Sequence, residues 1–87
     1  MNIKEHENII NHLRSLIDKN EYYITQHAHT EMYEEFYAID DVTYGIKNGE
    51  IIEHYPEHKR GTCCLINGKT NKNRPIHIVT RRKFILS

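Results

Sequence analysis

The sequence predicts an α+β domain in which N-terminal helices pack on one face of a small antiparallel sheet of three to four strands. Apolar residues recur at helical spacing in the first half of the chain, whereas the second half has short, strand-like apolar runs. Helices followed by strands are typical of this class. The 87 residues suffice for one domain, 1–87, with a thin core. We therefore expect a shallow, open functional site.

The first helix is expected over residues of about 4–19. Its apolar residues form one stripe, and polar residues occupy the other side. Asn20 follows, and asparagine tolerates the left-handed conformation that closes many helices. A short extended segment at 22–24 then leads to the next helix. The stripe consists of Ile9, Ile10, Leu13, Leu16 and Ile17.

Two shorter helices should follow. The second is expected over about 26–36, because Thr25 is a favourable N-cap residue, and this register puts His27 in its first turn. The third is expected over about 41–48, between a capping aspartate, Asp40 or Asp41, and a stop at Gly49.

Three strands are expected over about 50–55, 62–67 and 76–80, and a segment at 83–86 would add a fourth strand at the edge. The polar stretch 67–73 begins with Asn-Gly, a sequence typical of tight hairpins. We expect this stretch to connect the second and third strands.

Charge is divided unevenly along the chain. Residues 1–46 contain 3 basic and 9 acidic side chains, whereas residues 47–87 contain 9 basic and 3 acidic ones. A chain divided in this way can present a positive face to an anionic partner such as nucleic acid while it stays neutral overall. The alternative is that the two halves cancel through ordinary surface salt bridges.

The expected compartment is the cytoplasm. No apolar stretch is long enough to span a bilayer, and the N-terminus lacks the apolar segment of a signal peptide, so we expect no membrane association. The only cysteines, Cys63 and Cys64, are adjacent, whereas small secreted domains usually carry several spaced cysteines. We expect both to be reduced and packed.

The segment Asn73-Arg74-Pro75-Ile76-His77 places a fixed cation and a proton carrier three residues apart at the start of a strand. Proline favours an extended Arg74, and strand alternation sends His77 to the face opposite its isoleucine neighbours. These two groups suit phosphate chemistry. The alternative is an arginine that decorates a turn and a histidine that faces solvent.

His27 is a second candidate for proton transfer, because imidazole titrates near neutral pH. The alternative is a histidine partly buried between helix and sheet and bonded to a backbone carbonyl. The histidines do not suggest a metal site: Pro56 separates His54 from His58, so this pair cannot share a helix face, and His27 and His29, two apart near a helix start, are also a poor chelating pair. We expect no metal and no other cofactor.

The order of these motifs carries a resemblance. From about residue 22 to residue 80 the chain resembles a widespread prokaryotic family of small toxin-like domains of unknown function. The resemblance rests on His27-Ala28, Tyr55-Pro56 and Arg74-Pro75-Ile76-His77, among other elements with similar spacing.

The resemblance implies a RelE-like fold and a metal-independent endoribonuclease that cleaves single-stranded RNA or mRNA, free or at the ribosome. It also implies the toxin half of a toxin–antitoxin pair, whose small antitoxin carries a zinc-binding CxxC motif. His27 and His77 would then transfer protons while Arg74 holds the phosphate. Tyr55 would stack on a base, unless it only packs at its strand end. Positive side chains would line the RNA path: Lys59, Arg60, Lys69 and Lys72.

One departure from that family leaves a second function open. Family members commonly have arginines at the positions of Glu31 and Glu35, so two basic contacts become acidic in this chain. The alternative function is a non-catalytic module that keeps the toxin-like fold and binds a small protein partner through its acidic first and second helices.

Overall fold

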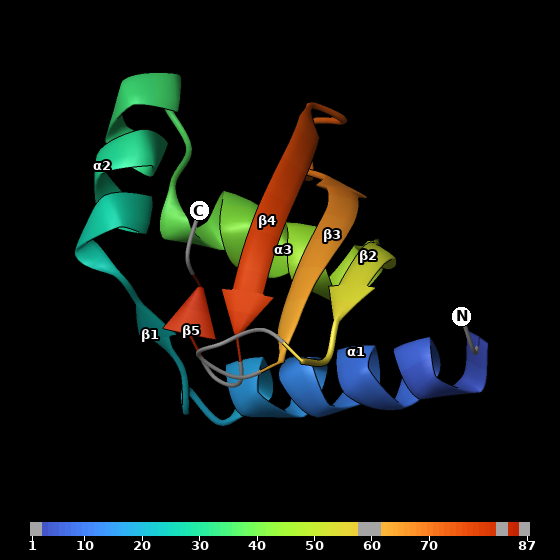
Figure 1. The fold of residues 1–87 in the computed structure, drawn as a ribbon. Helices are drawn as coiled ribbons and strands as arrows, with labels where there is room; N and C mark the ends of the chain where they lie inside the picture. Colours follow the sequence, from blue (N-terminus) through green and yellow to red (C-terminus); the bar gives the residue numbers. More distant parts are fainter. Residues whose placement is uncertain (1–2, 58–61, 82–83, 86–87) are drawn as a thin grey trace.

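The computed structural model describes residues 3–57, 62–81 and 84–85, and it confirms the predicted α+β class (Figure 1). Three helices pack with a sheet whose centre is three antiparallel strands. Within the described residues, no helix has the length and apolar character needed to cross a membrane. The elements in chain order are α1 (Ile3–Asp18), β1 (Tyr23–Ile24), α2 (Gln26–Glu35), α3 (Ile39–Asn48), β2 (Glu50–Tyr55), β3 (Cys63–Lys69), β4 (Pro75–Arg81) and β5 (Phe84–Ile85).

The strands lie in the order β1-β5-β4-β3-β2. Neighbours from β2 to β5 run antiparallel, whereas the two-residue β1 runs parallel to β5. The register pairs His77 of β4 with Asn67 of β3, and Val79 with Leu65. Because paired residues share a face of the sheet, these four side chains point to the same side.

Helices α1 and α3 cover the other side of the sheet, and α2 stands beside β4 (Figure 1). Helix α3 lies directly on β4: a Cβ added to Gly45 would be 2.8 Å from Ile76 Cγ2 and 3.1 Å from Ile78 Cδ1. The face that carries His77 is therefore the open face. The core consists of Ile10, Leu13, Ile17, Met32, Val42, Ile46, Ile51, Cys64, Ile66, Ile76 and Ile78.

The helix ends agree with the sequence at two points and differ at a third. Asn20 has a positive φ of 56°, and Thr25 Oγ1 accepts a hydrogen bond of 3.2 Å from the Ala28 N–H. The third helix begins at Ile39 with Ala38 at the N-cap, so the expectation that Asp40 or Asp41 caps it is wrong. The Asp41 carboxylate instead reaches back and accepts from the Ala38 N–H at 2.8 Å.

Gly49 and Gly68 are required by close packing rather than by turn geometry. Gly49 ends α3 with φ −97°, outside the left-handed region, but an added Cβ would lie 2.8 Å from the Asn67 carbonyl oxygen. Gly68 lies within β3, where an added Cβ would be 2.5 Å from the Gly45 carbonyl oxygen. The Asn67-Gly68 pair is thus no part of the hairpin connection, which spans only residues 70–74.

Candidate active site

Arg74 is held in place by the turn that precedes β4. The Thr70 N–H donates to the Arg74 carbonyl at 2.8 Å, and Thr70 Oγ1 accepts from the Arg74 N–H at 3.2 Å. Asn73 supplies the sharp bend with a φ of 64°. Pro75 favours an extended backbone at the residue before it, Arg74. The guanidinium therefore leaves the backbone in a defined direction.

The Arg74 side chain points toward α2 and lies over an aromatic ring. Its Cζ is 3.9 Å from the centroid of the Tyr37 ring, a cation–π contact. Tyr37 is tied to the same strand, because its hydroxyl donates to the Pro75 carbonyl at 2.7 Å. Tyr37 is a site residue that the sequence pattern does not reveal, since no local spacing links it to Arg74.

Two carboxylates of α2 contact the predicted cationic and proton-carrying groups. His27 lies in the first turn of α2, and its Nε2 is 2.6 Å from Oε1 of Glu31, one helical turn later. Glu35 Oε2 is 3.9 Å from Arg74 Nη2, too long for a hydrogen bond. The His27 side chain is 74% exposed, so it is not the half-buried histidine of the alternative interpretation.

His77 lies on the open face, opposite to Ile76 and Ile78, as strand alternation predicts. It borders a cleft of about 200 Å³ between α2 and β4. His27 and Arg74 are not lining residues themselves. They adjoin the cleft through their contacts with Glu31, Glu35 and Tyr37, which line it. The lining residues are Glu31, Met32, Glu35, Tyr37, Val42, Ile76, His77 and Ile78.

The cleft thus has His77 in its lining, and three further lining residues contact the other candidates: Glu31 contacts His27, whereas Glu35 and Tyr37 contact Arg74. Such a set can transfer two protons and hold an anion. Because a carboxylate only accepts hydrogen bonds, Glu31 favours the His27 tautomer that carries its hydrogen on Nε2. The other ring nitrogen, Nδ1, is then the one that can accept a proton from a substrate. The i,i+4 spacing of His27 and Glu31 could have indicated this contact from the sequence.

The other predicted RNA-binding residues are spread more widely. Lys69 ends β3 and Lys72 lies in the turn before Arg74, so both belong to the end of the sheet that carries Arg74. Lys59 and Arg60 fall outside the described residues.

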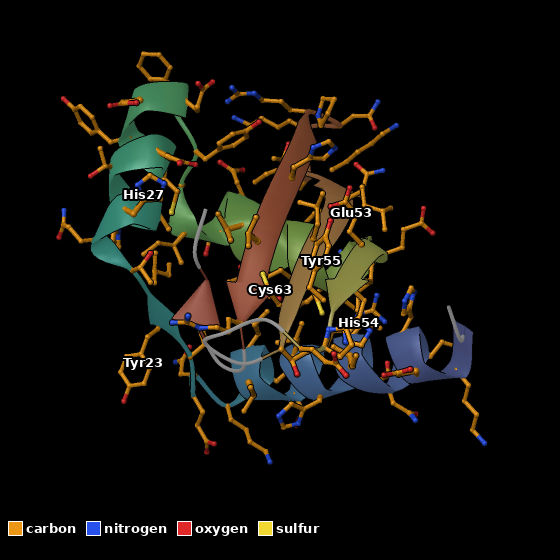
Figure 2. All side chains as sticks on the ribbon, in the orientation of Figure 1. Tyr23, His27, Glu53, His54, Tyr55 and Cys63 are labelled. Atoms are coloured by element: carbon orange, nitrogen blue, oxygen red, sulfur yellow. The ribbon has the colours of Figure 1, made fainter. Side chains whose placement is uncertain are left out.

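Tyr55 lies at the end of β2, well apart from His27 on α2 (Figure 2). The register pairs it with Cys63, which pairs in turn with Arg81 at the far end of β4. The residue is 51% exposed, and its hydroxyl donates to Glu53 Oε2 at 2.7 Å. That hydrogen bond to a carboxylate raises the pKa of Tyr55.

A second pair of histidines, distant in the sequence, lies between α1 and β2. The rings of His6 and His54 are 5.8 Å apart at an interplanar angle of 86°, and His54 Nδ1 is 3.7 Å from Glu5 Oε1. Both Nε2 atoms are buried without a hydrogen bond. Across the described part of the chain, no three His, Cys, Asp or Glu side chains are arranged to hold a metal ion.

Comparison with known protein families gives one finding. Residues 24–84 match the family described as "Domain of unknown function (DUF4258)". This region begins just before α2 and includes the whole cleft. No curated protein and no solved structure gives a significant match.

Proposed function

This chain belongs to the DUF4258 family of domains of unknown function, and we propose that it is a metal-independent endoribonuclease that cleaves single-stranded RNA or mRNA. The observation that supports the proposal is that His77 lines the cleft between α2 and β4, while Glu31 and Glu35 of the same lining contact His27 and Arg74. A base, an acid and a phosphate-binding cation are the groups that such cleavage needs.

In the proposed reaction the RNA 2′-hydroxyl attacks the adjacent phosphorus, and the bond to the 5′-oxygen of the next nucleotide breaks. One imidazole accepts the 2′-hydroxyl proton, and the other donates a proton to the departing 5′-oxygen. The products are a 2′,3′-cyclic phosphate and a 5′-hydroxyl. Arg74 donates hydrogen bonds to the phosphate oxygens, where negative charge increases in the transition state.

The distribution of charge supports a phosphate bound at Arg74, at the start of β4. Lys69, Lys72 and Arg74 lie within a few residues of one another around the β3–β4 turn. The two α2 carboxylates are not isolated negative charges, because Glu31 contacts His27 and Glu35 contacts Arg74. RNA would therefore approach over the turn, where its backbone meets the lysines.

Incubation of the purified protein with a mixed-sequence single-stranded RNA in EDTA tests the proposal. Removal of a general acid or base should slow cleavage by about 10²- to 10⁴-fold, so His77→Ala and His27→Ala should both be severely impaired, and Arg74→Ala as well. His29→Ala is a matched control, because His29 is an exposed histidine of the same helix. Intact RNA with the wild-type protein would refute the proposal, as would equal rates for the control and the three variants.

The proposal includes a RelE-like toxin role in the cytoplasm, on free mRNA or at the ribosome. Its partner would be a small antitoxin with a zinc-binding CxxC motif, encoded beside this gene. Co-expression of that neighbour should neutralise the RNA cleavage and yield a stoichiometric complex. The toxin role is refuted if the neighbouring product neither binds nor inhibits.

A second candidate function, a protein-binding module, is favoured by the end of α2. Tyr33 and Phe36 are 86% and 89% exposed, and Phe36 adopts a left-handed φ of 59°, which a bulky residue rarely does. The neighbouring Glu34 and Glu35 would repel RNA but suit a basic protein surface. Phe36→Asn should fold normally, because asparagine tolerates this conformation, and should lose the partner in a pull-down. Unchanged partner binding would exclude this surface.

A further inference from the structure

A larger depression lies at the end of the sheet that carries the β3–β4 turn. It has a volume of about 510 Å³, within the range of small-molecule sites. The C-terminal turn of α3 forms one side, and β3 with the β3–β4 turn forms the other. Its lining consists of Tyr44, Asn48, Gly49, Glu50, Asn67, Gly68, Lys69, Thr70, Asn71, Asn73 and Pro75.

Four asparagines from three different elements line this depression, which we call the asparagine pocket. Asn48 uses its Nδ2 to donate to the Tyr44 carbonyl at 3.1 Å. The side chains of the other three, Asn67, Asn71 and Asn73, make no hydrogen bond to another described residue; Asn71 and Asn73 lie in the β3–β4 turn, and Asn67 points to the open face of the sheet. Each free amide offers adjacent donors and an acceptor. Such a set suits the edge of a nucleobase better than an inorganic anion.

An aromatic ring completes the requirements for an unpaired base. Tyr44 is 42% exposed in the pocket wall and is no part of the buried core. Single-stranded RNA is recognised by bases that stack on aromatic side chains while their edges form hydrogen bonds. Among the bases, adenine is the usual partner of an asparagine amide, which donates to N7 and accepts from the N6 amino group.

Two residues of the pocket lining are neighbours of the proposed catalytic residues on β4. Pro75 belongs to its lining and directly follows Arg74. His77 is two residues further along β4, about 7 Å away at the usual rise of a strand. Asn67, another lining residue, is the cross-strand partner of His77. A base in this pocket would therefore leave its own phosphate near Arg74 and His77.

We propose that the asparagine pocket binds an adenine base of single-stranded RNA next to the scissile phosphate and so selects where the chain is cut. This inference rests on the proposed ribonuclease function. Lys69, also in the lining, provides the positive charge for the neighbouring phosphate, while Glu50 is the single carboxylate among the lining residues described.

Titration of the ¹⁵N-labelled protein with AMP, and separately with GMP, CMP and UMP, tests binding without any cleavage. AMP should bind most tightly and should shift the side-chain amide signals of Asn67, Asn71 and Asn73. Tyr44→Ala should weaken AMP binding by about tenfold or more, since loss of a stacked base has that effect. Tyr44→Phe should retain binding, and Tyr33→Ala is the matched control for loss of an exposed tyrosine elsewhere.

Sequencing of the RNA cleavage ends provides a second, independent test of the pocket. Wild-type protein should cut with adenine enriched at one fixed position beside the cut, and Tyr44→Ala should remove that enrichment while cleavage persists. Cleavage without base preference, or AMP that binds no better than the other three nucleotides, overturns the inference and leaves the ribonuclease intact. Selective AMP binding without RNA cleavage supports the pocket and refutes the proposed function instead.

Discussion

Neutralisation of Glu35 is expected to strengthen RNA binding, because this carboxylate competes with phosphate for Arg74. The charged atoms of the pair are 3.9 Å apart, and the side chains are 67% and 43% exposed. Two unit charges at about 4 Å interact by about 1 kcal/mol in water, and exposed pairs measure about 0.2–1 kcal/mol. Glu35→Gln should therefore change the free energy of unfolding by less than about 1 kcal/mol.

The interaction energy of the Glu35–Arg74 pair also limits the gain in RNA affinity. A competing interaction of up to about 1 kcal/mol corresponds to about a fivefold lower Kd for single-stranded RNA once it is removed. The change in Kd can be measured by fluorescence anisotropy at low salt with an uncleavable 2′-deoxy oligonucleotide. The gain in affinity should shrink as salt is added.

A matched variant separates this contact from a general charge effect. Glu34→Gln removes the same charge from the neighbouring position of α2, where the side chain is exposed. It should give a smaller gain than Glu35→Gln. In an Arg74→Ala background the advantage of Glu35→Gln should disappear, as a double-mutant cycle would show. An equal gain from both glutamines, or a gain that survives the loss of Arg74, would refute the role given to this pair.

Three further predictions concern the stability of the fold. His54→Phe should leave the free energy of unfolding unchanged or raise it by about 1 kcal/mol in urea denaturation, because it removes a buried, unpaired Nε2; a loss above about 1 kcal/mol would contradict this. Gly68→Ala should destabilise by about 1–3 kcal/mol, because its Cβ would meet the Gly45 carbonyl oxygen at 2.5 Å; an unchanged thermal midpoint would contradict the tight α3–β3 packing. Burial raises the pKa of Cys64 from 9.0 to about 11, so the folded state holds this proton more tightly than the unfolded state. Stability should then decline from about pH 9 to pH 11, by about 2 kcal/mol at most, and Cys64→Ala should flatten that decline.

Local signals account for the parts of the fold that the sequence predicts well. Thr25 caps α2 through a hydrogen bond three residues away, and His77 takes its face from simple alternation with its isoleucine neighbours. The α+β class follows from the change of apolar periodicity between the two halves of the chain. Each of these features depends on residues that are close in sequence.

The features that the sequence does not predict depend on contacts between distant segments. Gly68 resembles a turn residue, but its lack of a side chain is required by the close approach of Gly45 in α3. Asp41 resembles an N-cap residue in the sequence. In the fold its carboxylate accepts from the Ala38 N–H, and α3 already begins at Ile39.

The candidate site shows the same division. Its three principal residues, Arg74, His77 and His27, can be selected from the sequence by their chemistry. Their supporting contacts are harder to predict, because the Tyr37 ring beneath Arg74 comes from a remote segment. Glu31 and Glu35 look like a loss of basic contacts in the sequence, whereas in the fold they lie beside His27 and Arg74.

Cleavage of a DNA oligonucleotide that contains a single ribonucleotide tests the central claim most directly. If the RNA 2′-hydroxyl is the nucleophile, the protein should cut in EDTA only after that ribonucleotide. Mass spectrometry should find a 2′,3′-cyclic phosphate on one product and a 5′-hydroxyl on the other, and His77→Ala should abolish both while His29→Ala should not. No cut at the ribonucleotide, or a cut that is independent of His77, would contradict the account.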